Sequence, residues 1–314
     1  MRVLFLGSPG RFSARALWGC LDAGYEICEF WYGHRTRRRA WRGDRQLGWF
    51  NPGWSVSAAI RRHRIPQLPV PPLRTATDLW LRATDLGAEL IVSAAFPYVA
   101  PLELLKLVPG RAVNLHPTIL PDYRGPQPLL GMLYRDEADR CGGVTLHQMV
   151  PELDAGPIIA QQRVPWNALG FRHWEADLGR ATYSLVRNSL PAYLRGDIRS
   201  QPQVAHGDVY FRSLDPASVV INHQRTANRA KHLLNSIGSY LTLKADAAGR
   251  LWKVSRFLDI VADRPLGLPP RIGPLRIEMD LADARVTMQR WLPGTSKIRR
   301  LKTFCLFSHL NPAA

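Results

Sequence analysis

Residues 112–128 read AVNLHPTILPDYRGPQP, a short apolar run that ends in polar residues and continues into a proline-rich segment. The prolines at 117, 121, 126 and 128 rule out a regular helix here and indicate a stiff loop. The apolar run predicts a strand, and its alternation places Asn114 and His116 on the same side of the pleat. The stretch therefore predicts a strand whose end presents two polar side chains beside a fixed loop.

Apolar runs of strand length recur on both sides of this stretch, separated by segments with helical periodicity. Strands are expected at 2–6, 26–32, 67–70, 90–94, 143–149 and 158–164, and helices at 13–23, 55–64, 77–86 and 174–194. The alternation predicts an α/β fold with a Rossmann-like, doubly wound, mostly parallel sheet covered on both faces. In such sheets ligands bind at the carboxyl ends of the strands, where Asn114 and His116 are expected.

The pattern changes after residue 201. One helix at 224–237 is followed by short strands at 240–243, 251–254, 275–279 and 285–291, and a further extended piece at 209–211 precedes them. We expect two domains, a larger one over residues 1–203 and a small β-rich C-terminal domain over residues 204–314.

Composition restricts the class of protein. The 314 residues are 46% hydrophobic and 21% charged, and no apolar run approaches the ~20 residues that cross a bilayer, so no membrane span is expected. The N-terminal apolar run is shorter than a secretory signal. The four cysteines are scattered without C-x-x-C spacing, which argues against a disulfide scaffold and leaves no metal site to expect. A reducing, cytoplasmic location is predicted.

The formal net charge of +17 attracts anions, which include nucleic acid, phosphorylated metabolites, polyglutamylated cofactors and anionic membrane surfaces. Alternatively, the high arginine content reflects genomic base composition and a solvated surface. The segment RTRRRAWRGDR, residues 35–45, concentrates this charge around Trp41. It is expected to be a loop, either one that contacts phosphates or an ordinary solvated one.

The segment Gly7 to Gly10 follows the first strand as a dinucleotide-binding loop does. The G-x-G-x-x-G pattern is absent, however, and Pro9 removes an amide donor. An NAD-dependent oxidoreductase is therefore disfavoured.

A second polar cluster, PELDAGPII at 151–159, follows the strand GVTLHQM. A crossover to a neighbouring parallel strand would set Asp154 facing His116. An amide donor, an imidazole and a carboxylate together suit acyl transfer from an activated donor, which needs no Ser or Cys nucleophile. Taken singly, a histidine at a strand end is more often structural.

NLHPTILPDYRGPQP followed by GGVTLHQMVPELDAGPII resembles the signature of the 10-formyltetrahydrofolate-dependent formyltransferases. That family's motif has Asn-x-His, a Leu-Pro-x-Tyr/Trp-Arg-Gly loop and a Leu-Asp-x-Gly element. SAAFPYVAP at 93–101 is similar to the family's folate-pocket segment. Size and layout resemble methionyl-tRNA formyltransferase and the related sugar and amino-acid N-formyltransferases.

The resemblance implies roles for individual residues. Asn114 and His116 would polarise the formyl carbonyl and stabilise the tetrahedral intermediate, and Asp154 would assist deprotonation of the amine. Binding of the co-substrate 10-formyltetrahydrofolate, largely through backbone groups, is assigned to Ala94, Ala95, Phe96, Pro97, Tyr98, Met149, Val150, Glu152 and Leu153. Acceptor binding is assigned to Ser8, Pro9, Tyr123 and Arg124. Phe96 and Tyr98 are alternatively core residues, and Arg124 alternatively braces the loop.

The acceptor is less constrained, because RGPQP stands where the tRNA-formylating family usually has Arg-Gly-Ala-Ala-Pro, and TILP where it has Ser-Leu-Leu-Pro. We therefore expect a small amine acceptor, such as an amino sugar nucleotide or an N-hydroxyornithine-type amine. The high positive charge favours an alternative, methionyl-tRNA formyltransferase with tRNA as partner. A non-catalytic RNA-binding protein on this fold is a further alternative.

Overall fold

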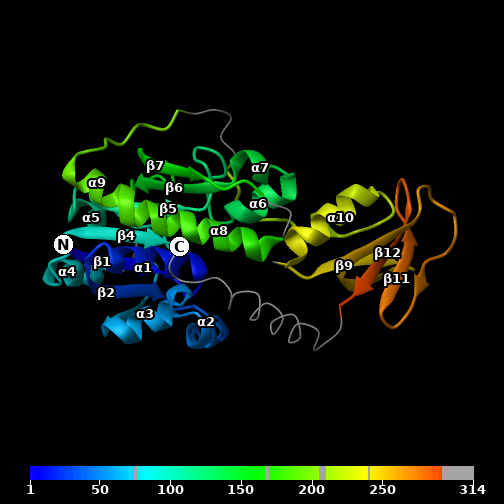
Figure 1. Ribbon diagram of the computed structural model, residues 1–314, viewed down its shortest axis with the longest axis horizontal. Coiled ribbons are helices and arrows are strands. Elements are labelled where there is room, and N and C mark those ends of the chain that lie inside the picture. Colours follow the sequence, from blue (N-terminus) through cyan, green and yellow to red (C-terminus); the bar gives the residue numbers. More distant parts are fainter. Residues whose placement is uncertain (74–76, 167–169, 205–209, 240, 292–314) are drawn as a thin grey trace.

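The computed structural model describes residues 1–73, 77–166, 170–204, 210–239 and 241–291 (Figure 1). These residues form a large sheet flanked by helices and a smaller sheet with one helix beside it. The small sheet lies at one end of the elongated molecule, next to the end of the large sheet's helical layer.

The large sheet has seven strands in the order β3-β2-β1-β4-β5-β6-β7. Their bounds are β1 Arg2–Gly7, β2 Glu26–Gly33, β3 Gln67–Val70, β4 Leu90–Ala94, β5 Ala112–His116, β6 Gly143–Gln148 and β7 Ile158–Arg163. Strands β1 to β5 are parallel to one another, whereas β6 is antiparallel to both of its neighbours. The predicted α/β, doubly wound, mostly parallel sheet is confirmed.

The connection from β5 to β6 differs from the expected parallel crossover. It contains only two short helices, α6 (Pro128–Arg135) and α7 (Ala138–Cys141), after the proline-rich loop. Neither helix is long enough to carry the chain back along the sheet, so β6 begins near the carboxyl end of β5. Strand β6 therefore pairs with β5 in the antiparallel direction.

The other helices are α1 Arg11–Asp22, α2 Arg38–Phe50, α3 Val56–His63, α4 Thr77–Asp85, α5 Leu102–Lys106, α8 Phe171–Ser184 and α9 Leu190–Arg195. The prediction of a loop at 35–45 is wrong from Arg38 onward, because helix α2 begins there. Arginine is a good helix former, and the charge cluster concealed this propensity. The expected helix at 174–194 is interrupted by a π-helical turn at Leu185–Ser189, just before Pro191, which lacks an amide donor.

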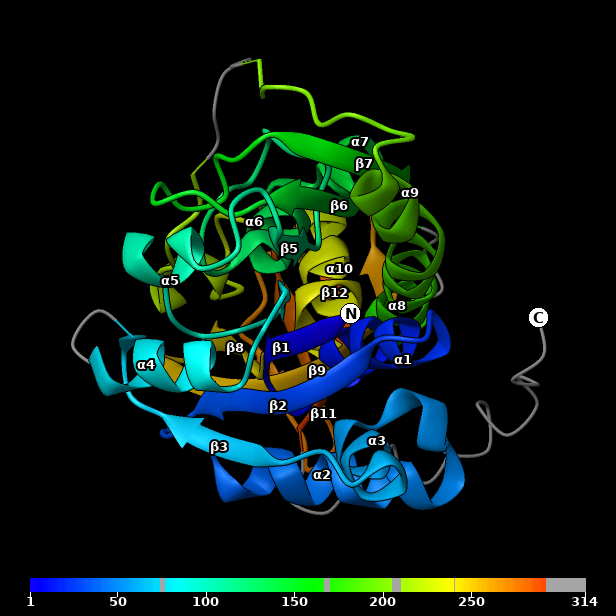
Figure 2. The ribbon, with the colours of Figure 1, turned by 90° about the vertical axis from the view of Figure 1, so that its left-hand side faces the viewer.

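Both faces of the large sheet are buried, which β1 illustrates. Val3 and Phe5 belong to the core beneath α1 and α8, whereas Leu4 and Leu6 belong to a second core beneath α4 and α5. Figure 2 shows α4 and α5 on one side of the sheet and α1, α3 and α8 on the other. The continuous apolar runs follow from this two-sided burial.

The small sheet is antiparallel with the order β10-β11-β12-β9-β8. Its strands are β8 Leu243–Ala247, β9 Arg250–Ala262, β10 Arg271–Ile272, β11 Arg276–Asp280 and β12 Arg285–Arg290, and α10 (Ala227–Asn235) packs on β9. The strand expected at 240–243 starts only at Leu243, and residue 240 lies outside the described residues, as do 205–209. The smaller, β-rich C-terminal part of the predicted fold is confirmed.

Two described positions after α9, Gln201 and Phe211, contact the large sheet and the loop after β5. Gln201 exchanges backbone hydrogen bonds with Ile158, and the Phe211 amide donates to the Arg124 carbonyl at 2.9 Å. The division at 203/204 falls between these two positions and stays a prediction. Across the part of the chain that the structure describes, no helix combines the length and the apolar character needed to cross a membrane.

Candidate active site

Three side chains converge because of the register between β5 and β6. Asn114 and His116 share one face of β5, and the antiparallel register pairs Asn114 with His147 of β6, which puts His147 on that same face. Asn114 Nδ2 lies 3.1 Å from His147 Nε2. The two imidazole rings are 6.5 Å apart between centroids, edge to face.

Asp154 reaches this group from the loop between β6 and β7. Its Oδ1 lies 3.5 Å from His116 Nδ1 and 3.4 Å from Asn114 Nδ2, and its Oδ2 accepts the Gly125 amide at 2.9 Å. Asp154 has φ 55°, in the left-handed region that a non-glycine residue adopts at a cost. The structure thus brings Asn114, His116 and Asp154 together, although through an antiparallel hairpin and not through the expected parallel crossover.

The hydrogen bonds of His147 define its tautomer. Its Nδ1 lies 2.8 Å from the Gln148 carbonyl, which only accepts, so Nδ1 carries the proton. Burial lowers the pKa of His147 well below the ordinary value, more strongly than Asp154 raises it, so the ring is neutral near pH 7. Nε2 then presents a lone pair, and the amide of Asn114 must turn its NH2 group toward it.

His116 is oriented in a comparable way from the other side. Its Nε2 lies 2.9 Å from the Tyr123 carbonyl and therefore donates to it. The other nitrogen, Nδ1, consequently faces Asp154, and His116 is buried with 4% of its surface exposed. A partly buried amide and a buried imidazole thus lie within hydrogen-bond range of a buried carboxylate, an arrangement that suits stabilisation of a developing oxyanion and transfer of one proton.

The group opens into a cavity of about 530 Å³ at the carboxyl ends of β4 and β5. Among its lining residues are Asn114, His116, His147 and Asp154, and most residues predicted to bind the co-substrate: Ala95, Phe96, Pro97, Tyr98, Met149, Val150 and Leu153. Ala94 is instead buried within β4, and Glu152 is exposed and does not line the cavity. Phe96 and Tyr98 contribute to the wall as well as packing on the neighbouring core.

The residues predicted to bind the acceptor do not line the cavity. Tyr123 is fully buried and its hydroxyl donates to Glu137, and burial together with this carboxylate raises the pKa of the phenol. The turn at Tyr123, with φ 58°, sends its ring into the core and its carbonyl toward His116. Arg124 donates to Gln203 Oε1 at 2.8 Å, as a brace of the loop does. Ser8 donates to the Ala95 carbonyl at 2.7 Å, and Pro9 lines a different surface pocket.

Two residues that hold the catalytic side chains in place, His147 and Gln203, were not predicted. His147 stands in the apolar strand GVTLHQM, and only the antiparallel register reveals that it faces Asn114. Gln203 donates to the carbonyls of Asp154 and Gly156 at 2.8 Å and 2.7 Å and so holds the Asp154 loop. Within the described ranges, no group of three or more His, Cys, Asp or Glu side chains is arranged to hold a metal ion.

Comparison with known proteins gives consistent matches. A family model described as formyl transferase matches residues 75–168. The methionyl-tRNA formyltransferase of Lactobacillus delbrueckii subsp. bulgaricus is 30% identical over 288 residues, which are 85% of this chain and 81% of the relative. That of Chloroflexus aurantiacus is 36% identical over 207 residues, 65% of this chain and 62% of the relative.

Solved structures match at the level of the fold. A sugar 3N-formyl transferase, WlaRD, has a TM-score of 0.64 at 14% identity, with 92% of this chain and 97% of that chain covered. An N-formyltransferase from Helicobacter canadensis, in complex with folinic acid and dTDP-3-aminofucose, has the same TM-score and identity, with 92% and 99% covered.

Proposed function

Because the chain belongs to the formyltransferase family, we propose that Asn114, His116 and Asp154 transfer the formyl group of 10-formyltetrahydrofolate to an amine in the cavity they line. The family resemblance drawn from the motifs is confirmed by 30% identity to a relative over 85% of the chain. The observation that carries the proposal is the convergence of an amide and an imidazole on one carboxylate, whose Oδ1 lies 3.4 Å from Asn114 Nδ2 and 3.5 Å from His116 Nδ1.

The cavity fits the co-substrate in size and character. Its volume lies within the range of small-molecule sites, and Phe96, Met149 and Leu153 give it apolar walls. The segments 96–98 and 150–153 are irregular and belong to no strand, whereas the Met149 amide still donates to the Ala112 carbonyl of β5. When bound, 10-formyltetrahydrofolate supplies a formyl group that is already activated, which is why the site needs no nucleophilic side chain.

Asn114 is the donor to the formyl oxygen. One Nδ2 hydrogen is held by His147, and the other makes only a 3.4 Å contact with Asp154, so a carbonyl oxygen in the cavity competes for it readily. His147 is a positioning residue, since its Nε2 lone pair decides which way the Asn114 amide faces.

Asp154 and His116 handle the proton. As the acceptor nitrogen bonds to the formyl carbon, it loses a proton to the Asp154 carboxylate, which His116 Nδ1 faces at 3.5 Å. Cleavage of the bond between the formyl carbon and the folate nitrogen would need a proton on that nitrogen, and the protonated Asp154 would return the one it received from the amine. The Gly125 amide keeps the carboxylate in place throughout.

We propose a small amine as the acceptor, such as an amino sugar nucleotide or an N-hydroxyornithine-type amine. The support is local: Pro126 and Gln127, which give the RGPQP loop its departure from the tRNA-formylating pattern, line the cavity. Methionyl-tRNA is the second candidate acceptor, favoured by the relatives named methionyl-tRNA formyltransferase and by the net charge of +17.

An acceptor screen tests the proposal. The protein is incubated with 10-formyltetrahydrofolate and, separately, an amino sugar nucleotide, N-hydroxyornithine and charged initiator tRNA, and the formylated product is measured by mass spectrometry. Formylation of a small amine is expected. Formylation of the tRNA alone would identify methionyl-tRNA as the acceptor in place of a small amine. RNA binding with no formylation of any amine would support the non-catalytic alternative.

A further inference from the structure

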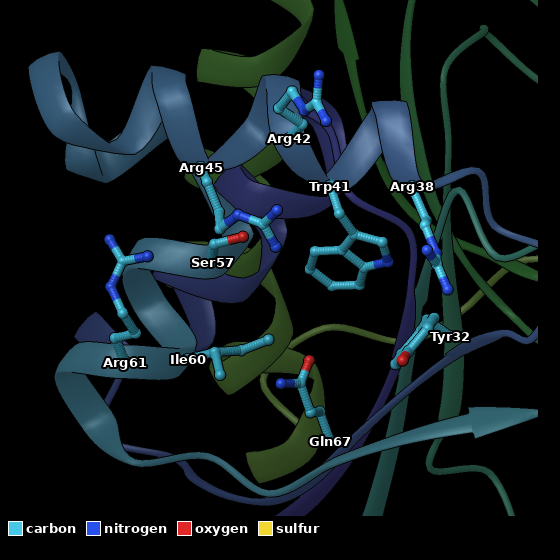
Figure 3. A pocket seen from close by; sticks show the side chains of 9 residues that line it. All are labelled: Tyr32, Arg38, Trp41, Arg42, Arg45, Ser57, Ile60, Arg61 and Gln67. Atoms are coloured by element: carbon cyan, nitrogen blue, oxygen red, sulfur yellow. The ribbon is translucent and has the colours of Figure 1, made fainter.

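A second cavity, of about 500 Å³, lies between α2, α3, the edge strand β3 and its neighbour β2 (Figure 3). It shares no lining residue with the active-site cavity. Its lining residues are Tyr32, Arg38, Trp41, Arg42, Arg45, Ser57, Ile60, Arg61 and Gln67, which we call the arginine pocket.

One face of α2 builds most of the arginine pocket. Arg38, Arg42 and Arg45 are spaced i, i+4 and i+7, with Trp41 between them, so all four side chains project from the same side of the helix. Arg39, the residue after Arg38, projects about 100° from Arg38 around the helix axis. Arg61 adds a fourth guanidinium from α3, on the opposite wall.

The acidic residue of α2 is used elsewhere. Asp44, the acid of α2, accepts the Ser57 amide at 2.7 Å and the Ser55 hydroxyl at 3.0 Å, and so caps α3. The first turn of α2 contains no acid, although it contains Arg38, whose charge opposes the helix dipole. Among the described residues, none forms an ion pair or a hydrogen bond with the guanidinium groups of Arg38, Arg42, Arg45 or Arg61.

The interior of the pocket is aromatic and apolar. Trp41 packs edge to face on Tyr32, with ring centroids 5.0 Å apart, and Ile60 lies below it. Figure 3 shows Arg45 pointing toward the indole from one side and Arg38 extending beside Tyr32 on the other. A flat ring held near Trp41 would therefore have guanidinium groups within reach at both ends.

We propose that the arginine pocket binds a nucleoside diphosphate. One guanidinium group can bind a phosphate through two parallel N–H···O hydrogen bonds. Several arginines without acidic partners also suit the negative charge of a diphosphate. The aromatic and apolar interior suits a base, which inorganic phosphate lacks. The rigid connection between α2 and α3, made by Asp44, keeps the two arginine-bearing walls at a fixed separation.

Isothermal titration calorimetry with ADP as the probe tests this site. One ADP is expected to bind per chain, more tightly than adenosine or inorganic pyrophosphate. Arg45→Ser and Arg61→Ser, which are exposed and leave the core intact, should each weaken ADP binding about tenfold or more. Arg39→Ser is the matched control, with the same loss of charge on the same helix but outside the pocket, and should leave the affinity within about twofold.

Three outcomes would overturn the proposal. Equal losses from Arg39→Ser and Arg45→Ser would mean diffuse attraction by the charged helix. Loss of ADP binding in saturating tetrahydrofolate would place ADP in the active-site cavity. Absence of saturable ADP binding, with tight binding of a short single-stranded RNA that all three variants weaken alike, would identify a nucleic-acid surface instead.

Discussion

His147 offers a way to separate two hydrogen bonds that a single imidazole makes. A glutamine at this position places an amide near the Nε2 position and keeps an acceptor for Asn114, whereas an asparagine places its amide near Nδ1 and keeps only the contact with the Gln148 carbonyl. We therefore expect His147→Gln to retain most of the activity and His147→Asn to lose it.

The size of the loss follows from what Asn114 retains. Removal of a fully oriented oxyanion donor costs about 10²- to 10³-fold in kcat. In His147→Asn the donor is still present, but its amide is held only by the 3.4 Å contact with Asp154, so kcat should fall about 10- to 100-fold. The KM for the amine should change much less, because the interaction strengthens only in the transition state.

Steady-state formyl transfer by the two variants is the assay, with His232→Gln as a control. His232 also hydrogen-bonds a backbone carbonyl, that of Leu133, but lies on α10 and does not line the cavity. The reasoning is refuted if His147→Asn matches His147→Gln in kcat while both variants remain folded by circular dichroism.

Three other predictions concern stability and the loop at 123–125. Burial lowers the pKa of His147 to about 4, below that of an unfolded histidine, so the unfolded chain binds more protons between about pH 6.5 and pH 4. As the pH falls through this window, urea titrations should show the wild type losing up to ~1.4 kcal/mol per pH unit relative to His147→Gln, and parallel pH profiles would contradict this. Gly125 has φ 109°, and an added Cβ would lie 2.9 Å from the Phe211 carbonyl oxygen, so Gly125→Ala should lower the free energy of unfolding by about 1–3 kcal/mol and also lower kcat. Gly24→Ala, at φ 80° with open space around the new Cβ, should cost less stability, and equal losses would argue against the clash. Tyr123→Phe should reduce stability by about 1–2 kcal/mol with kcat nearly unchanged, and a large fall in kcat would restore Tyr123 to the acceptor site.

Local patterns were sufficient for the strands and for part of the site. The runs at 2–6 and 90–94 are apolar because both faces of the sheet are buried, and a period of two placed Asn114 and His116 on one face. These features depend on residues close together in the chain, which a sequence displays directly.

The missed features depend on direction and register. Whether β6 runs parallel or antiparallel to β5 decides that His147 faces Asn114, and nothing in GVTLHQM encodes that direction. Similarly, the left-handed backbone at Tyr123 sends its ring into the core while its carbonyl serves His116. Clusters of charged residues occur both in solvated loops and on exposed helix faces, so the arginines of 35–45 did not distinguish α2 from a loop.

The most direct test of the account is the turnover of Asp154→Asn with a verified amine acceptor. The asparagine keeps the size of the side chain and a carbonyl oxygen for the Gly125 amide, but it cannot take a proton from the amine. The account predicts a fall in kcat of about 10²-fold or more, with the affinity for tetrahydrofolate, measured by calorimetry, within about threefold of the wild type. Unchanged turnover with unchanged tetrahydrofolate affinity would show that Asp154 does not act on the proton, and would contradict the proposed mechanism.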